Sequence, residues 1–316
     1  MYATLSGGCK FSKLDLSQAF LQVELDEDSR KFTTINTQRG LFQYTRLPFG
    51  ISSSPSIFQR VMDNLIQGLQ HTCAYQDDIL VTGKDDTNHL ANLEAVFKRL
   101  SDAGVHLKRE KCVFMAPEVT YLGYKIDSSG LHPVEDKLEV ICEAPAPTNV
   151  TELRSYLGLL NYYGRVLPNL SSELAPLHQL LQKNAKFLWE KPQQLAFQRS
   201  KQLLKSSNLL VHFDSSKQIV LSCDASPYGL GAVISNVIDG VESPISCASR
   251  TLSSAEKAYS LLEKEALAVV WALRNFTTTC MEISSQSTMI TNLLKLSSVS
   301  GTNFLHWHQV VFNVGL

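Results

Sequence analysis

The chain has 316 residues, 44% hydrophobic and 19% charged, which is the composition of a folded protein long enough for two or more domains. Its net charge of −1 excludes a protein that is basic throughout, although it leaves room for a local basic groove. The seven cysteines include no CxxC pair, which argues against structural zinc and against a disulfide framework. No signal peptide and no membrane-spanning apolar run are evident, so we expect an intracellular protein with reduced thiols and no membrane partner. These features do not distinguish cytoplasm from nucleus.

The first predicted strand begins almost at the N-terminus. Residues 10–16 read as a strand with Asp15 near its end, directly after a turn at Gly7 and Gly8. A lone aspartate at such a place is most often a cap or turn residue. Because a core strand that starts this early has little before it to pack on, we expect the N-terminus to be truncated.

A helix is predicted next, after a loop marked by Pro48 and Gly50. Serines 52–54 with Pro55 are typical of a helix start. Apolar residues then recur at helical spacing as far as about Leu69, at Ile57, Phe58, Val61, Met62, Leu65 and Ile66.

Two adjacent carboxylates, Asp77 and Asp78, follow this helix. They lie between an apolar stretch and the β-branched stretch 79–81, which predicts a hairpin with the aspartate pair at its turn. Two like charges side by side repel unless a cation lies near them, and hard oxygen ligands of this kind suit Mg²⁺. A lone Asp-Asp pair is more often a solvated surface turn, so the assignment needs support from elsewhere in the chain.

Helices dominate the middle of the sequence. An amphipathic helix is predicted within residues 86–107 and ends at Gly104. The segment 144–147 (APAP) is a linker, after which a new helix opens with Thr148 or Thr151 as its cap. Further helical segments are predicted at 174–181 and 193–204.

A second unit is predicted to begin near residue 209. Its strands are expected at 218–226, 229–234 and 243–249, with Asp224 near the end of the first. The small residues of the second strand, Gly229 and Gly231 among them, predict a close approach of another segment to the backbone. A single helix is predicted from 253 to 276, with a buried face formed by Leu261, Leu262, Leu267, Val270, Trp271, Leu273 and Phe276.

Three blocks of the first unit together resemble the palm motifs of reverse transcriptases. They are residues 11–20 (FSKLDLSQAF), 47–50 (LPFG) and 75–78 (YQDD), and they are most similar to the polymerase of gypsy-type LTR retrotransposons. Any one block is a weak signal, whereas three in order at the right separations are a strong one. The resemblance continues to about Phe276. It implies an α+β fold, with a polymerase palm and a helical thumb and connection, followed by an incomplete ribonuclease H-like α/β domain.

The resemblance implies a metal site. The three metal-binding carboxylates of the family correspond to Asp15, Asp77 and Asp78, which would hold two Mg²⁺ ions for nucleotidyl transfer onto a primer 3′-hydroxyl. Phe20 matches the aromatic residue that lies under the incoming sugar and excludes a 2′-hydroxyl, although core packing explains an aromatic residue there equally well.

Other substrate contacts follow from the same resemblance. Phe49 and Tyr75 would line the substrate site, whereas Gln76 replaces a common hydrophobic residue, with a modest expected effect. The segment Leu122, Gly123 and Tyr124 is similar to the primer grip, a hairpin that holds the primer strand.

The triphosphate site is expected to be incomplete. Lys111, or Lys108, would face the triphosphate, although a solvated surface lysine is the more common situation. The basic residues that clamp the triphosphate in this family belong to the fingers, upstream of the matching start of this chain. We therefore expect truncated fingers, the loss of point-charge and bidentate phosphate contacts, and doubtful polymerase activity.

The second unit resembles ribonuclease H, which cleaves the RNA of an RNA–DNA hybrid with two metal ions. Asp224 matches its first carboxylate and Glu265 its second. Glu263 competes for the second role, but the apolar phase of the helix favours Glu265. A surface role is the default for any one helix glutamate. The family's third carboxylate, in an Asp-His-Lys-Pro-Leu segment, is missing.

A shift of reading frame would explain the missing carboxylate. Met289 and Ile290 are encoded by ATG followed by AT, and a shift of two letters yields GAT, an aspartate codon. Allowed codons for residues 291–294 then read His-Lys-Pro-Leu, and the same shift turns 279–282 into Leu-Tyr-Gly. We therefore expect an out-of-frame, poorly ordered tail at 277–316, and absent or weak ribonuclease H activity.

The resulting prediction is an RNA-directed DNA polymerase fragment with a palm at 1–95, a thumb and connection at 96–208 and a partial ribonuclease H-like domain at 209–276. The expected partners are a primed RNA or DNA template, an RNA–DNA hybrid and deoxynucleoside triphosphates, with Mg²⁺ as cofactor. The alternative is a catalytically inactive, retroelement-derived nucleic-acid-binding relic or a pseudogene product. The oligomeric state is not indicated.

Overall fold

The computed structural model describes residues 5, 7–205, 210–276 and 308–312. The chain divides into two compact units, Met1–Ser128 and Ser129–Leu316. Among the described residues, no helix is long and apolar enough to cross a membrane, and the six cysteines are all free.

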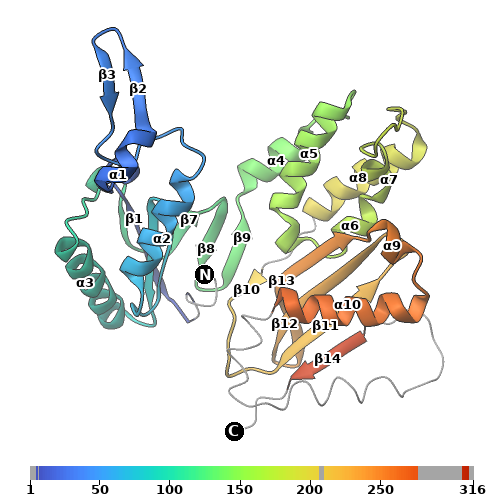
Figure 1. The fold of residues 1–316 in the computed structure, drawn as a ribbon. Coiled ribbons are helices and arrows are strands. Elements are labelled where there is room, and N and C mark those ends of the chain that lie inside the picture. Colours follow the sequence, from blue (N-terminus) through green and yellow to red (C-terminus); the bar gives the residue numbers. More distant parts are fainter. Residues whose placement is uncertain (1–4, 6, 206–209, 277–307, 313–316) are drawn as a thin grey trace. The chain divides into compact units, whose positions relative to one another are not determined.

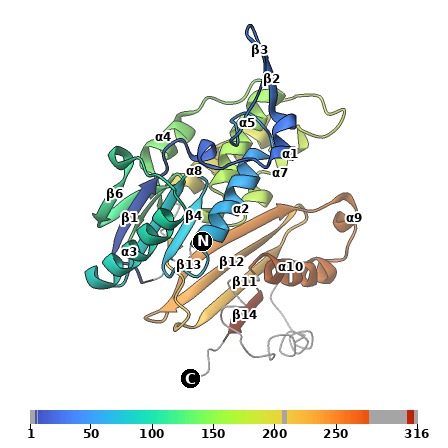
Figure 2. The same cartoon turned by 60° about the vertical axis from the view of Figure 1, so that its left-hand side comes forward.

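The first unit is built on an antiparallel sheet with the strand order β4-β5-β1-β6 (Figures 1 and 2). Its strands are β1 (Lys10–Asp15), β4 (Thr72–Tyr75), β5 (Asp78–Gly83) and β6 (Val113–Ala116). Helices α2 (Ser54–Ile66) and α3 (Asp86–Asp102) pack against this sheet, as the apolar periodicity predicted. Pro55 lies in the first turn of α2, where its missing N–H costs little, and the Asp85 carboxylate caps α3 by accepting from the Asn88 N–H.

One core joins the sheet to these two helices. It includes apolar side chains of β1, β5, α2 and α3, namely Leu14, Ile79, Val81, Phe58, Met62, Leu93, Val96 and Leu100. Strand β1 pairs antiparallel with β5 along its whole length, and Leu14 lies opposite Ile79 in the core. That register pairs Asp15 with Asp78.

Two hairpins complete the first unit. Strands β2 (Thr34–Thr37) and β3 (Gly40–Gln43) form a hairpin that projects from the body of the unit and exposes the residues of both strands (Figure 1). Strands β7 (Glu118–Tyr121) and β8 (Tyr124–Asp127) form the other. Short helical turns join these elements: η2 (Ala19–Gln22), α1 (Glu27–Arg30), η3 (Lys31–Thr33) and η4 (Arg109–Lys111).

The second unit begins with a short strand and a series of helices. Strand β9 (Gly130–Pro133) pairs with β10 (Leu210–Val211). Between them lie α4 (Glu135–Glu143), α5 (Val150–Tyr162), η5 (Gly164–Val166), α6 (Leu170–Glu173), α7 (Ala175–Gln179) and α8 (Lys191–Lys205). The cap of α5 is Asn149 rather than Thr148 or Thr151, because the Asn149 side chain accepts from the Glu152 N–H. Thr148 instead donates to the Glu152 carboxylate from its N–H and its hydroxyl.

The second unit also contains an antiparallel sheet with the order β13-β12-β11-β14 (Figure 2). Its strands are β11 (Ile219–Ala225), β12 (Gly229–Ile238), β13 (Val241–Thr251) and β14 (His308–Phe312). The close approach predicted at the glycines is present. A Cβ on Gly231 would lie 1.9 Å from Asn169 Oδ1, and one on Gly229 would lie 2.8 Å from the Arg250 carbonyl oxygen.

The predicted helix at 253–276 is in fact two helices, α9 (Ser254–Lys257) and α10 (Leu261–Asn275). Ser253 and Ser260 each form a capping box, and the second box starts a new helix where the sequence pattern suggested a continuous one. The predicted buried face was partly wrong, since Leu261, Leu262 and Val270 are exposed. The small residues Ala268 and Ala272 are buried instead, because α10 packs closely on β11 and β12.

The predicted out-of-frame tail lies mostly outside the described residues. Its segment 308–312 is described and forms β14, which pairs antiparallel with β11.

Candidate nucleotidyl-transfer site

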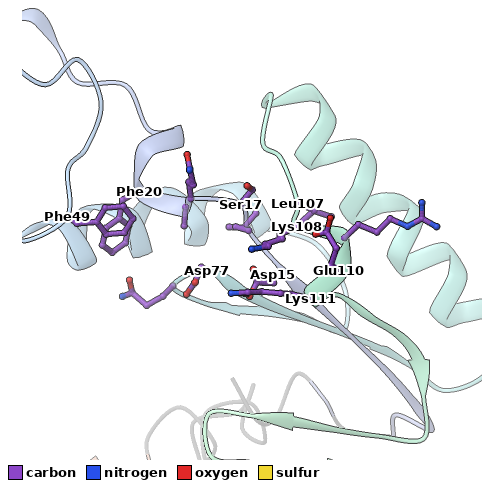
Figure 3. A pocket seen from close by; sticks show the side chains of 14 residues that line it. Asp15, Ser17, Phe20, Phe49, Asp77, Leu107, Lys108, Glu110 and Lys111 are labelled. Carbon is purple, nitrogen blue, oxygen red and sulfur yellow. Dashed lines mark ion pairs between the residues drawn. The ribbon is translucent and has the colours of Figure 1, made fainter.

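A cavity of about 710 Å³ opens in the first unit beside the end of β1 (Figure 3). Four separate stretches of sequence line it: residues 15–20, Phe49, residues 76–77 and residues 107–111. The cavity therefore brings together Asp15, Asp77, Phe20 and Phe49, which the sequence assigned to one site.

Main-chain hydrogen bonds place the two carboxylates in this cavity. The Leu16 N–H donates to the Asp77 carbonyl oxygen at 3.0 Å, which ties the hairpin tip to the end of β1. The Lys108 N–H donates to the Asp15 carbonyl oxygen at 2.8 Å, which brings the segment 107–111 to the same place. Asp15 is buried to 8% exposure, whereas Asp77 is exposed.

The hairpin turn differs by one residue from the prediction. The turn consists of Gln76 and Asp77, and Asp78 is already the first residue of β5, paired with Tyr75. Gln76 has a φ of 55°, a left-handed conformation that is uncommon for a residue other than glycine. The aspartate pair is therefore divided between the turn and the strand.

The side chains of the two aspartates have different surroundings. The Asp78 carboxylate lies 3.0 Å from Lys13 Nζ, and the side chains are 22% and 24% exposed, respectively. Burial raises the pKa of the Asp78 carboxyl, and Lys13 opposes that effect. Asp78 does not line the cavity that holds Asp15 and Asp77. The structure thus brings Asp15 and Asp77 together and turns Asp78 towards Lys13.

The ammonium group of Lys111 faces the Asp15 carboxylate. Lys111 Nζ lies 3.6 Å from Asp15 Oδ2, and both side chains line the cavity together with Lys108. Figure 3 shows Asp15, Asp77 and Lys111 close together, with the rings of Phe20 and Phe49 on the far side of Asp77. A cation bound between the carboxylates would compete with Lys111 for Asp15.

The donor set of the cavity fits Mg²⁺. This ion is commonly held by one or two carboxylates, with water and substrate phosphates completing its coordination, and Asp15 and Asp77 supply two such groups. Across the described part of the chain, no three His, Cys, Asp or Glu side chains are grouped closely enough to hold a metal ion. Two carboxylates, Asp15 and Asp77, line the cavity, and Asp78 lies opposite Asp15 in the pairing of β1 with β5.

Aromatic side chains form the opposite wall. The Phe20 ring lies 5.2 Å from the Phe49 ring and 5.1 Å from the buried Phe58 ring, measured between centroids. Phe20 packs against the core and also lines the cavity, while its predicted contact with the incoming sugar stays a prediction. Tyr75 is 46% exposed and does not line this cavity.

Two of the three predicted primer-grip residues, Leu122 and Gly123, form the turn between β7 and β8, and Tyr124 is the first residue of β8. Leu122 and Gly123 have φ angles of 47° and 68°, which is typical of a tight hairpin turn. Tyr124 is buried at 4% exposure, so its side chain is not available at the surface, and Leu122 is half-buried. The Tyr121 hydroxyl lies 3.5 Å from the Asp78 carbonyl oxygen and links this hairpin to β5.

In the second unit, the two predicted ribonuclease H carboxylates lie on elements that pack together. Asp224 is half-buried in β11, and Glu265 is half-buried on α10. Glu263 is exposed, and its carboxylate accepts from the Ser260 N–H at 2.7 Å. This hydrogen bond lowers the pKa of the Glu263 carboxyl. Glu263 therefore belongs to the helix cap at Ser260, whereas Glu265 lies two residues further along α10, the helix that packs on β11.

Family comparisons match both units. Residues 2–126 match the family described as reverse transcriptase (RNA-dependent DNA polymerase), and residues 189–288 match the RNase H-like domain found in reverse transcriptase. The chain carries a reverse transcriptase domain followed by a ribonuclease H-like domain. Both are homologous to the corresponding domains of retrotransposon Pol polyproteins.

Three relatives illustrate this homology. The retrovirus-related Pol polyprotein from transposon 297 of Drosophila melanogaster is 38% identical over 85% of this chain and 26% of its own length. The Pol polyprotein from transposon 412 of the same species is 36% identical over 84% of this chain and 22% of its own length. The Tf2-3 transposon polyprotein of Schizosaccharomyces pombe is 32% identical over 87% of this chain and 21% of its own length. The chain thus spans about a quarter of the length of these relatives or somewhat less.

The fold agrees with that of solved polymerases. The foamy viral protease–reverse transcriptase in complex with an RNA/DNA hybrid superposes with a TM-score of 0.75 at 24% identity, covering 94% of this chain and 44% of that one. The same viral protein in complex with double-stranded DNA gives a TM-score of 0.71 and covers 94% of this chain and 68% of that one.

Sequence reasoning missed two residues that shape the site. Lys13 lies two positions before Asp15 on β1, and side chains two apart on a strand share one face, so the spacing was a usable signal. Gln59 on α2 is bonded to the hairpin turn, and no local pattern marks it.

Proposed function

We propose that the cavity in the first unit is the nucleotidyl-transfer site of a gypsy-type LTR retrotransposon reverse transcriptase. The observation that carries this proposal is the meeting of Asp15 and Asp77 in one cavity with Phe20 and Phe49. These side chains come from distant parts of the chain, and a solvated surface turn would not require them to converge.

Each side chain has a role in this proposal. Asp15 and Asp77 would hold Mg²⁺, which when bound supplies Lewis-acid stabilisation of the charge that develops on the attacking and leaving oxygens. Phe20 would support the incoming sugar, held against Phe49 and Phe58. Lys111 is within reach of Asp15, and we infer that it turns to the triphosphate when a metal ion takes its place. Asp78 would be the third metal-binding carboxylate, opposite Asp15 in the strand pairing, and its ion pair with Lys13 would have to open for it to bind the metal ion.

The proposed partners are a primed RNA or DNA template and deoxynucleoside triphosphates. The structural neighbours named above carry an RNA/DNA hybrid or double-stranded DNA, which supports a nucleic-acid duplex as the partner. Tyr75, exposed at the hairpin, and the turn at Leu122 and Gly123 are the proposed duplex contacts in the first unit.

In the second unit, Asp224 and Glu265 are the proposed metal-binding carboxylates of a ribonuclease H-like site acting on an RNA–DNA hybrid. The proposed domains are the palm at 1–95, the thumb and connection at 96–208 and the ribonuclease H-like domain at 209–276. The family match at 189–288 overlaps the last of these and extends beyond it on both sides.

Primer extension on an RNA template with Mg²⁺ tests the proposed polymerase function. The Asp77→Asn/Asp78→Asn double variant should abolish extension, whereas Asp102→Asn, an exposed aspartate at the end of α3, should leave it unchanged. Extension that survives in the double variant would contradict the proposal. A folded protein that binds duplex in a salt-dependent way without extending it would instead be a nucleic-acid-binding relic.

A further inference from the structure

The side chain of Gln59 bonds to both sides of Tyr75 in the candidate catalytic hairpin. Gln59 Oε1 accepts from the Gln76 N–H at 2.7 Å, and its Nε2 donates to the Ala74 carbonyl oxygen at 3.1 Å. A third bond runs the other way, because Gln76 Nε2 donates to the Pro55 carbonyl oxygen at 3.3 Å. Helix α2 therefore holds the tip of the hairpin through one amide side chain and one backbone carbonyl.

Gln76, whose N–H is bonded to Gln59, has an unfavourable backbone conformation. Gln76 has a φ of 55°, and a residue other than glycine keeps such a conformation only where its surroundings determine it. Asp77 follows directly, and its carbonyl oxygen is bonded to the Leu16 N–H. The turn that carries Asp77 is thus tied to β1 on one side and to α2 on the other, and Gln59 is the side chain that makes the α2 connection from the helix.

The chemistry of this connection requires an amide. A backbone N–H must be met by an acceptor and a backbone carbonyl by a donor, and one glutamine amide supplies both. A glutamate of the same length would accept from Gln76 but could not donate to Ala74. A leucine of similar size would do neither.

We propose that Gln59 is a positioning residue of the nucleotidyl-transfer site, which sets the place of Asp77 by holding the left-handed turn at Gln76. This inference rests on the proposed function. Release of the turn would let Gln76 relax towards a negative φ and move the Asp77 carboxylate relative to Asp15. A displacement of about 1 Å at a catalytic group lowers a rate by about 100-fold.

The test compares Gln59→Leu, Gln59→Glu and a matched control. Asp63 accepts a hydrogen bond from Gln59 Nε2 at 2.8 Å and is exposed, and Asp63→Asn keeps an acceptor oxygen without touching the hairpin. In Gln59→Leu we expect amide hydrogen exchange in the peptide 72–83 to become about tenfold faster, as the loss of a hydrogen bond predicts. Its kcat for primer extension should fall about 100-fold while its KM for the nucleotide changes little. Gln59→Glu should be intermediate in both, and Asp63→Asn should match the wild-type protein.

Several outcomes would overturn this inference. Unchanged exchange in Gln59→Leu would show that the side chain does not hold the turn, and faster exchange with an unchanged kcat would show that the turn does not position Asp77. If Gln59→Leu fails to fold by circular dichroism, Gln59→Glu carries the same comparison. Absence of extension by the wild-type protein would refute the proposed function, whereas the exchange data would still decide whether Gln59 holds the turn.

Discussion

Ser12 on β1 takes part in a chain of hydrogen bonds with His89 and β6, and its replacement by alanine should destabilise the first unit. His89 Nδ1 lies 3.0 Å from the Lys10 carbonyl oxygen, which can only accept, so this nitrogen carries the proton. His89 Nε2 then accepts from the Ser12 hydroxyl at 2.7 Å, and the Ser12 oxygen accepts from the Met115 N–H at 3.0 Å. Ser12 and His89 are both fully buried.

The cost of Ser12→Ala follows from the groups that it leaves without partners. The bond to Lys10 keeps the histidine in its present tautomer, so Nε2 becomes a buried acceptor with no donor, and the partly buried Met115 N–H loses its acceptor. An orphaned buried polar group costs about 1–3 kcal/mol, and together these losses predict a free energy of unfolding lower by about 2–4 kcal/mol. That is a large share of the stability of an ordinary domain.

The assay must report on the first unit alone. The three tryptophans, at 189, 271 and 307, all lie in the second unit, so their fluorescence serves as an internal control. Hydrogen exchange of β1 peptides at increasing denaturant measures the first unit. Ser12→Ala should raise the exchange rate of β1 amides and leave the unfolding transition seen by tryptophan fluorescence as in the wild-type protein. Ser56→Ala, at an exposed position of α2, should change neither. A loss below about 0.5 kcal/mol, the range of ordinary surface substitutions, would refute the reasoning.

Three further outcomes follow from the structure. Burial lowers the pKa of His89 below its ordinary value of 6.5, so the unfolded chain takes up a proton at a higher pH than the folded chain does. The free energy of unfolding should therefore be greatest above pH 6.5 and fall below it by up to about 1.4 kcal/mol per pH unit. Hydrogen exchange of β1 between pH 5 and 8 measures this dependence, and His89→Gln should flatten the profile. Gly83→Ala should destabilise the protein by about 2 kcal/mol or more, because the new Cβ would lie 2.4 Å from the His89 backbone nitrogen. Gly158→Ala should stabilise it by about 0.5–1 kcal/mol, because Gly158 lies in α5 with nothing within 4 Å of its Cβ position. Denaturant midpoints test both variants, and equal effects would contradict the packing. Phe20→Val should lower discrimination against ribonucleotides by about 10–100-fold in single-nucleotide extension, and unchanged discrimination would show that Phe20 serves the core alone.

The sequence predicted the elements that carry the site better than it predicted their contacts. Local patterns of apolar residues predict the strand ending at Asp15 and the helix after Pro55, and both are present. The meeting of Asp15 with Asp77 was expected only through the resemblance to polymerase motifs. No local rule brings residues from distant stretches of sequence into one cavity.

The errors at the hairpin have a physical cause. Aspartate is favoured in turns, so the pattern placed both aspartates there, but cross-strand pairing with Tyr75 assigns Asp78 to β5. The turn instead uses Gln76 in a left-handed conformation that glutamine seldom adopts without tertiary support, and Gln59 supplies that support from another element. The ion pair of Lys13 with Asp78 likewise depends on strand register, which the sequence does not state.

The projecting hairpin of β2 and β3 was not predicted at all. Its strands are short, and every residue in them is exposed, so they lack the alternation of buried and exposed positions from which strands are inferred.

Cleavage of the chain by a bound metal ion tests most directly whether Asp15 and Asp77 form one cation site. Fe²⁺ in place of Mg²⁺, with ascorbate and peroxide, generates radicals that cut the backbone close to the ion. We predict cuts near residues 15–20, 76–78 and 107–111, the segments that line the cavity, and their suppression by excess Mg²⁺ and by Asp15→Asn or Asp77→Asn. Cuts that are missing from these segments, or that persist in both variants, would contradict the assignment.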